Sequence, residues 1–137
     1  HRGPDGFGYE RKEDGTLVKF SHFGKVIIND NVDIGSNTCI DRGTINDTII
    51  GEGSKVDNLV HIGHNVRIGK NCVIIAQSMI GGSTVIDDNV WISPSSVIRD
   101  GLRIGRHALI GMGSVVTKNI PANEIWIGTP AKFYKTK

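Results

Sequence analysis

The stretch from Ile50 to Val116 carries an aliphatic residue at every sixth position, and this period decides the fold. The residue directly after each of these positions is often Gly, and the residue four positions on is small or apolar. A period of six fits neither an amphipathic helix nor an alternating strand, so it predicts short strands separated by corners. The repeated positions, all Ile or Val, are Ile50, Val56, Ile62, Ile68, Ile74, Ile80, Ile86, Ile92, Ile98, Ile104, Ile110 and Val116.

Three such hexads close one triangular coil, and successive coils stack about 4.8 Å apart, the spacing of paired strands. Ile and Val favour extended backbone and pack inward, whereas Gly and Asn suit corners where a positive φ is tolerated. No coil buries its own aliphatic residues, so stacking must create one continuous core. The sequence therefore predicts an all-β parallel β-helix, a hexapeptide-repeat solenoid of roughly six coils.

The repeat extends backwards through Ile40, Ile34 and Ile28, with a slip of four residues between Ile40 and Ile50. Residues from about 5 to 25 break the pattern, and we expect a loop excursion with a hairpin around Asp14-Gly15. An irregular tail is expected over about 121–137, because Pro121 and Pro130 bound it. The whole chain, 1–137, is predicted to be one β-helix domain.

The composition excludes several classes of protein. A formal net charge of +2 with scattered Lys and Arg argues against nucleic-acid binding. No apolar run approaches the roughly 20 residues that a membrane-spanning helix needs. Two cysteines are too few for a disulfide framework, so reduced thiols and a cytoplasmic location are expected. Whether a further domain precedes residue 1 is open.

His64 is the candidate general base. It follows the inward-facing Ile62 by two residues, which places it on an outward corner. An imidazole titrates near working pH and can take a proton from an attacking amine or hydroxyl. Asp57, one corner earlier, could support it only through the fold or across a subunit boundary. The alternative is a solvated surface histidine.

Gly82 lies one full coil, 18 residues, beyond His64. A glycine stacked on the base lets a ligand approach the backbone, and its N–H could bind a developing oxyanion. The alternative is that Gly82 only permits the corner.

Four motifs resemble the UDP-3-O-acylglucosamine N-acyltransferases of lipid A synthesis: Asp5-Gly6-Phe7-Gly8, Thr38 to Gly43, Asp47 to Gly51, and Asp57-Asn58 followed by His64-Asn65. The resemblance runs from Gly3 to about Gly82. It implies a left-handed β-helix, a homotrimer with active sites between subunits, a nucleotide-sugar substrate and an acyl carrier protein as partner. It also implies His64 as base, Gly82 as oxyanion donor, and Asp57, Asn58 and Asn65 as substrate-binding residues. That family has another histidine where this chain has Gly101.

The last third resembles a second group, the coenzyme-A-dependent sugar and xenobiotic acetyltransferases. The matching stretches are Ile110 to Pro121 and Gly128 to Lys132. In that group small residues border the pantetheine arm and lysines lie near nucleotide phosphates. The resemblance implies a cofactor-binding set of Gly111, Gly113, Ser114, Lys118 and Lys132, with a chain exit and a solvated corner as the alternative.

We therefore expect an N-acyltransferase that moves an acyl group from acyl-coenzyme A or acyl carrier protein to an amino group on a nucleotide-linked sugar. The second hypothesis is an acetyl-coenzyme-A-dependent acetyltransferase of another sugar or small molecule. No metal and no tightly bound cofactor are expected, since His61 and His64 belong to different faces of a coil. A non-enzymatic β-helix scaffold would not need the set of Asp57, Asn58 and His64.

Overall fold

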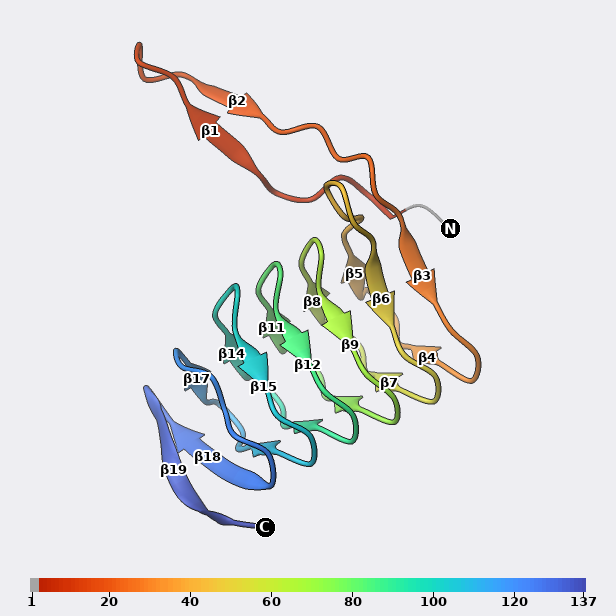
Figure 1. Cartoon of the computed structure of the whole chain (residues 1–137), viewed down its shortest axis with the longest axis vertical. Helices are drawn as coiled ribbons and strands as arrows, with labels where there is room; N and C mark the ends of the chain where they lie inside the picture. The colour runs from red at the N-terminus through yellow and green to blue at the C-terminus, as the bar shows by residue number, and fades with distance from the viewer. Residues whose placement is uncertain (1–2) are drawn as a thin grey trace.

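The computed structural model describes residues 3–137, and in it the chain winds into a three-sided parallel β-helix (Figure 1). Each side of the prism is one sheet of stacked strands, and we number these sides as faces. Face 1 contains β3 (Val26–Ile28), β6 (Thr48–Ile50), β9 (Arg67–Ile68), β12 (Val85–Ile86) and β15 (Arg103–Ile104). Face 2 contains β4 (Asp33–Ile34), β7 (Lys55–Val56), β10 (Val73–Ile74), β13 (Trp91–Ile92) and β16 (Leu109–Ile110). Face 3 contains β5 (Cys39–Ile40), β8 (His61–Ile62), β11 (Met79–Ile80), β14 (Val97–Ile98) and β17 (Val115–Val116).

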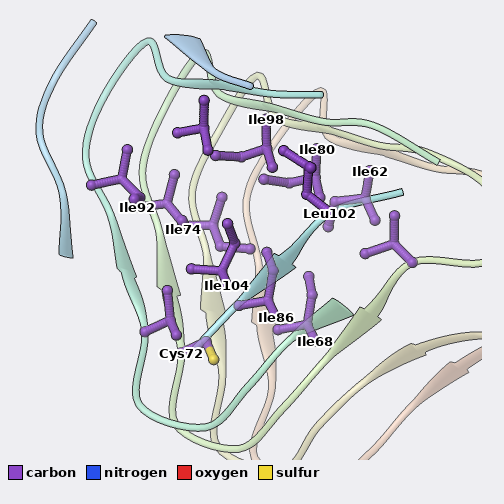
Figure 2. Close-up of a cluster of buried hydrophobic side chains, with 14 of the residues drawn as sticks. Ile62, Ile68, Cys72, Ile74, Ile80, Ile86, Ile92, Ile98, Leu102 and Ile104 are labelled. Carbon is purple, nitrogen blue, oxygen red and sulfur yellow. The ribbon is translucent and has the colours of Figure 1, made fainter. Parts of the chain in front are cut away.

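The predicted fold class is confirmed, and the hexad register is the pairing register. Ile62, for example, pairs with Ile40 of the preceding coil and Ile80 of the next. All twelve repeated Ile and Val positions are at most 3% exposed. Figure 2 shows several of these side chains gathered inside the coils, where each buried isoleucine contributes about 1.5–3 kcal/mol of transfer free energy.

The first repeat positions are more exposed than those in the middle of the solenoid. Ile28 keeps its place opposite Ile50 but is 40% exposed, because no complete coil lies beyond it. In the middle, adjacent residues of one strand lie on opposite sides of it: Trp91 points outward and is 42% exposed, whereas Ile92 is fully buried.

Two kinds of residue make the corners, for different reasons. The left-handed residue is the one three positions after the buried Ile or Val, and it is often Asn, with φ of 61° at Asn65 and 54° at Asn71. The glycine directly after the buried residue has another cause. A Cβ on Gly63 would lie 2.8 Å from the Gly82 nitrogen, so close stacking of coils requires glycine there. The expected positive φ of corner glycines occurs at Gly53, Gly101 and Gly113, and not at the glycines directly after the buried residue.

The excursion contains the expected hairpin, formed by β1 (Tyr9–Arg11) and β2 (Leu17–Lys19). It projects away from the first coils (Figure 1). Its base is tied to the solenoid by Asp5, which pairs with Lys19 at 3.1 Å and with Arg42 at 3.5 Å. The hydrogen bond from Lys19 lowers the pKa of the Asp5 carboxyl below its ordinary value.

The segment 121–137 is ordered rather than irregular. β18 (Glu124–Gly128) pairs in parallel with β16, and β19 (Ala131–Thr136) returns antiparallel to it. This hairpin closes the last coil, with Trp126 packed against the core and Ala131 buried. The hexad period could not reveal it, because both strands are longer than the two-residue strands of the coils. Among the described residues no helix is long and apolar enough to cross a bilayer.

Candidate active site

His64 stands at the corner that joins β8 on face 3 to β9 on face 1. The corner forms because Ile62 and Val66 are buried on either side of it, and the backbone reverses through the left-handed Asn65. The His64 side chain is half-buried. Its Nδ1 lies 3.1 Å from Asn65 Oδ1, which leaves Nε2 on the side of the next coil.

Gly82 lies directly over the His64 ring, as the 18-residue step predicts. A Cβ built on Gly82 would lie 2.7 Å from His64 Nε2 and 3.0 Å from Cδ2 and Cε1. The Gly82 N–H donates to no group within residues 3–137.

The corner itself does not require glycine at this position. Gly82 has no positive φ, and the equivalent position two residues after the buried Ile or Val holds Asn58 and Ala76 in neighbouring hexads. A side chain at position 82 would instead meet the His64 ring, so the glycine leaves space beside it.

His64 lies between two hollows of opposite character. On one side is an apolar hollow of about 840 Å³, roofed by the excursion. On the other side is a smaller polar groove of about 400 Å³. The apolar hollow is lined by Phe7, Gly8, Tyr9, Leu17, Phe20, Ser21, His22, Phe23, Thr44, Ile45 and His64. The polar groove is lined by Thr44, Ile45, Asn46, Asp47, His64, Asn65, Arg67 and Ser83. A substrate with one apolar and one polar part could span the histidine.

The sequence argument missed two titratable residues near His64. His22 comes from the excursion, is 5% exposed, and meets the His64 ring edge to face at 5.8 Å between centroids. Its Nδ1 lies 2.9 Å from the Phe20 carbonyl oxygen, and its Nε2 is buried without a hydrogen bond in the described part of the chain. No periodic signal marks His22, since the excursion has no repeat.

Asp41 is the second missed residue, a buried carboxyl at the start of the slip. Burial raises the pKa of Asp41, and the nearby imidazoles of His61, His64 and His22 act in the opposite direction. Its Oδ2 lies 3.7 Å from His61 Nε2. A signal existed in the sequence, because Asp41 belongs to the stretch Thr38 to Gly43 that carried part of the resemblance.

Asp57 and Asn58 lie on another edge of the prism, at the corner between faces 2 and 3. Asp57 accepts hydrogen bonds from the backbone N–H groups of Asn58, at 2.7 Å, and Ala76, at 3.2 Å. Asn58 Oδ1 accepts one from Ser36 at 2.6 Å. Neither residue lines the hollows beside His64. Within one chain the structure does not bring them to the base, and both brace the stacking of coils.

The five residues expected to bind coenzyme A are also separated. The corner between faces 2 and 3, where Asp57 lies, also holds Gly111, Gly113 and Ser114. Lys118 lies at the corner between faces 3 and 1, as His64 does, and Lys132 is exposed on β19. Ser114 is fully buried, and its Oγ accepts a hydrogen bond from the Gly128 N–H at 3.1 Å. Ser114 is therefore closed to a ligand in this conformation. Among residues 3–137 the His, Cys, Asp and Glu side chains form no group of three that could hold a metal ion.

The three-sided coil of aliphatic hexads is the fold expected of a hexapeptide-repeat transferase. A model of the family described as bacterial transferase hexapeptide (six repeats) matches residues 47–82 and 83–118, more than half of the chain. The chain belongs to this hexapeptide transferase family.

The similar curated proteins are named more narrowly. UDP-3-O-acylglucosamine N-acyltransferase from Methylobacterium nodulans is 51% identical over 130 residues, which are 95% of this chain and 37% of the relative. The protein of the same name from Campylobacter lari is 43% identical over 133 residues, 97% of this chain and 42% of the relative. The chain thus spans about two fifths of the curated relatives that it matches.

The fold has close counterparts among solved structures. A UDP-N-acetylglucosamine acyltransferase from Bacteroides fragilis superposes with a TM-score of 0.86 at 26% identity, over 98% of this chain and 51% of that chain. That neighbour is a left-handed β-helix, and a coil of the opposite hand could not superpose on it. The expected left hand of the β-helix is thereby confirmed.

Proposed function

We propose that this chain transfers an acyl group from a thioester donor to the amino group of a nucleotide-linked amino sugar, in lipid A or surface-glycan biosynthesis. The observation that carries the proposal is that His64 Nε2 lies beside the backbone of Gly82, which has no side chain and whose N–H makes no hydrogen bond within residues 3–137. The relatives from Methylobacterium nodulans and Campylobacter lari are named as N-acyltransferases of a UDP-linked acylglucosamine, and this supports the proposed acyl acceptor.

The chemistry follows from these two groups. The neutral amine attacks the thioester carbonyl while His64 Nε2 takes the proton that the amine loses. The Gly82 N–H donates to the oxyanion that develops on the carbonyl oxygen. The tetrahedral intermediate collapses, the C–S bond breaks, and the protonated His64 returns the proton to the leaving thiolate. Both substrates meet in one site, so no covalent enzyme intermediate is required.

The two hollows favour a long acyl chain over an acetyl group. Phe7, Phe23 and Ile45 are 85%, 79% and 84% exposed, yet they lie on the wall of the apolar hollow. Covering them with an acyl chain removes apolar surface from water at about 25 cal/mol per Å². The polar groove with Asn46 and Arg67 suits the sugar and its phosphates. As donor we propose acyl-coenzyme A or acyl carrier protein, with Lys118 and Lys132 as exposed cations for its phosphates.

Replacing Gly82 with Ala should lower kcat about a hundredfold, because the new methyl group displaces the His64 ring and a misplacement of about 1 Å costs that much. The variant should keep the melting temperature of the parent, since Ala76 occupies the equivalent corner position in the preceding hexad. Thiol release from an acyl thioester in the presence of a UDP-linked amino sugar measures the rate. Unchanged turnover would show that the space over His64 is not used.

We also propose that three copies of the chain assemble around one axis. In this assembly the prism edge that carries Asp57 on one subunit meets the prism edge that carries His64 on the next. Face 3 lies between these two edges, so it must point toward the threefold axis. Its outer residues from the third coil onward are apolar, namely Met79, Val97 and Val115. Burying such a strip is the expected reason for a closed cyclic assembly. A cytoplasmic location remains part of this proposal.

Light scattering should give a mass near that of three 14.8 kDa chains. Met79→Glu should shift it toward one chain, since a charge would face its own copies across the axis. Val85→Glu, at the same hexad position on face 1, is the matched control and should leave the mass unchanged. A parent protein that scatters as a single chain at micromolar concentration would rule out the shared site.

A further inference from the structure

The Asn65 side chain is held by the loop that the four-residue slip inserts. Its Oδ1 lies 3.1 Å from the Thr44 backbone nitrogen and 2.9 Å from Thr44 Oγ1. Its Nδ2 lies 2.9 Å from the Asn46 carbonyl oxygen. A backbone N–H only donates and a backbone carbonyl only accepts, so these two contacts settle which way the amide points.

The fixed amide in turn fixes the protonation of the base. Asn65 Oδ1 can only accept a hydrogen bond, and it lies 3.1 Å from His64 Nδ1. His64 Nδ1 must therefore carry the proton, and a neutral ring then has its lone pair on Nε2. Nε2 is the nitrogen beneath the Gly82 backbone. The loop thus delivers the base in the form that the proposed reaction needs.

Ordinary corners do not provide this arrangement. Asn71 and Asn89 occupy the same hexad position as Asn65 with similar φ, 54° and 60° against 61°. Their side chains make no hydrogen bond within the described part of the chain, because the hexads beside them have no inserted loop. Asn65 alone of these three also donates its backbone N–H to a side chain, Thr48 Oγ1, at 2.9 Å. The slip between Ile40 and Ile50 is the cause of the difference.

We propose that Asn65, clamped by residues 44–46, is a positioning residue that holds His64 in the Nδ1–H tautomer. The inference rests on the proposed function for its catalytic meaning, but the tautomer itself does not depend on the substrate. The titratable and charged groups that face His64 are His22 from the excursion, Asp41 from the slip, and Asp47 and Arg67 of the polar groove. Within residues 3–137 none of these groups hydrogen-bonds to a ring nitrogen of His64, so only Asn65 holds Nδ1.

The test is Asn65→Gly, which deletes the amide and keeps the backbone, since glycine adopts a φ of 61° without strain. Nitrogen-15 spectra of the imidazoles, with His64→Ala used to assign the signals, should show the parent His64 protonated at Nδ1. In the variant the ring should move toward the Nε2–H form, which free neutral histidine prefers. With substrates, kcat should fall about 10- to 100-fold with little change in KM. Asn71→Gly is the matched control and should change neither.

Two results would overturn the inference. One is a parent His64 whose proton resides on Nε2, and the other is an Asn65→Gly spectrum and kcat equal to those of the parent. If the parent transfers no acyl group from any thioester, the proposed function fails while the spectra still decide the tautomer. Circular dichroism melting of both glycine variants separates lost positioning from lost folding.

Discussion

His64→Ala should reduce acyl transfer by about 10²- to 10⁴-fold, the usual loss for a missing general base. The loss arises because no other imidazole within residues 3–137 takes its place beside Gly82: His22 Nε2 is buried, and His61 points outward from face 3. The fold should persist, since a half-buried corner side chain contributes little packing to the solenoid. Binding of the thioester donor should also persist, because the walls of both hollows remain.

The measurement is thiol release across a range of pH, with the parent and the variant compared at saturating substrates. The parent profile should have an acidic limb on which rate rises as the base loses its proton, and that limb should vanish with His64. His107→Ala is the control, a histidine at another corner of the same solenoid. If His64→Ala keeps more than about a tenth of the parent rate, His64 is not the base. The transferase assignment would then rest on the family alone.

The site exists where the repeat is broken, and this explains which parts of it a sequence reveals. The coils follow from local rules, since each hexad needs an inward aliphatic residue and a corner. His64 and Gly82 could be placed by counting, because both obey the 18-residue step. The walls of the site could not, since Phe7 and Ile45 come from an excursion and a slip that have no period. Their positions depend on long-range contacts such as Asp5 with Arg42.

Residue roles were harder to predict than residue positions. Asn65 stands next to His64 in sequence and was expected to bind substrate. Its side-chain oxygen and nitrogen hydrogen-bond within the chain, and a substrate role for it stays a prediction. Asp57 was a candidate partner for His64 because it lies one corner earlier in the chain. Consecutive corners lie on different edges of the prism, however, so the two side chains are separated within one chain. A substrate role for Asp57 and Asn58 remains a prediction that depends on a neighbouring subunit.

The slip and the excursion distinguish the corner at His64 from the other corners within residues 3–137. Stacked hexads alone make corners of constant length, with no inserted segment beside them. At His64 the excursion adds an apolar roof and the slip adds a polar wall. Gly82 has no side chain and so leaves space over the His64 ring. In the proposed site, the excursion and the slip supply shape and orientation, Gly82 supplies the oxyanion donor, and the regular coils supply rigidity.

Ile86→Asp should unfold the chain, and the outward neighbour Val85→Asp should not. Ile86 is 1% exposed and stacks between Ile68 and Ile104 of the adjacent coils. Removing it forfeits about 2–5 kcal/mol of packing, and an unpaired carboxylate in an aliphatic column adds several kcal/mol more. The sum is comparable with the whole stability of a domain, about 5–15 kcal/mol.

The damage should spread along the solenoid, because each coil is buried only by its neighbours. Circular dichroism melting should therefore show no cooperative transition for Ile86→Asp, and a midpoint close to the parent for Val85→Asp. The adjacent pair is a sharp control: the two residues share one strand, β12, and differ only in which side of the sheet they face. Equal melting of the two variants would mean that the inward and outward positions have been exchanged, and with them the placement of every corner, His64 included.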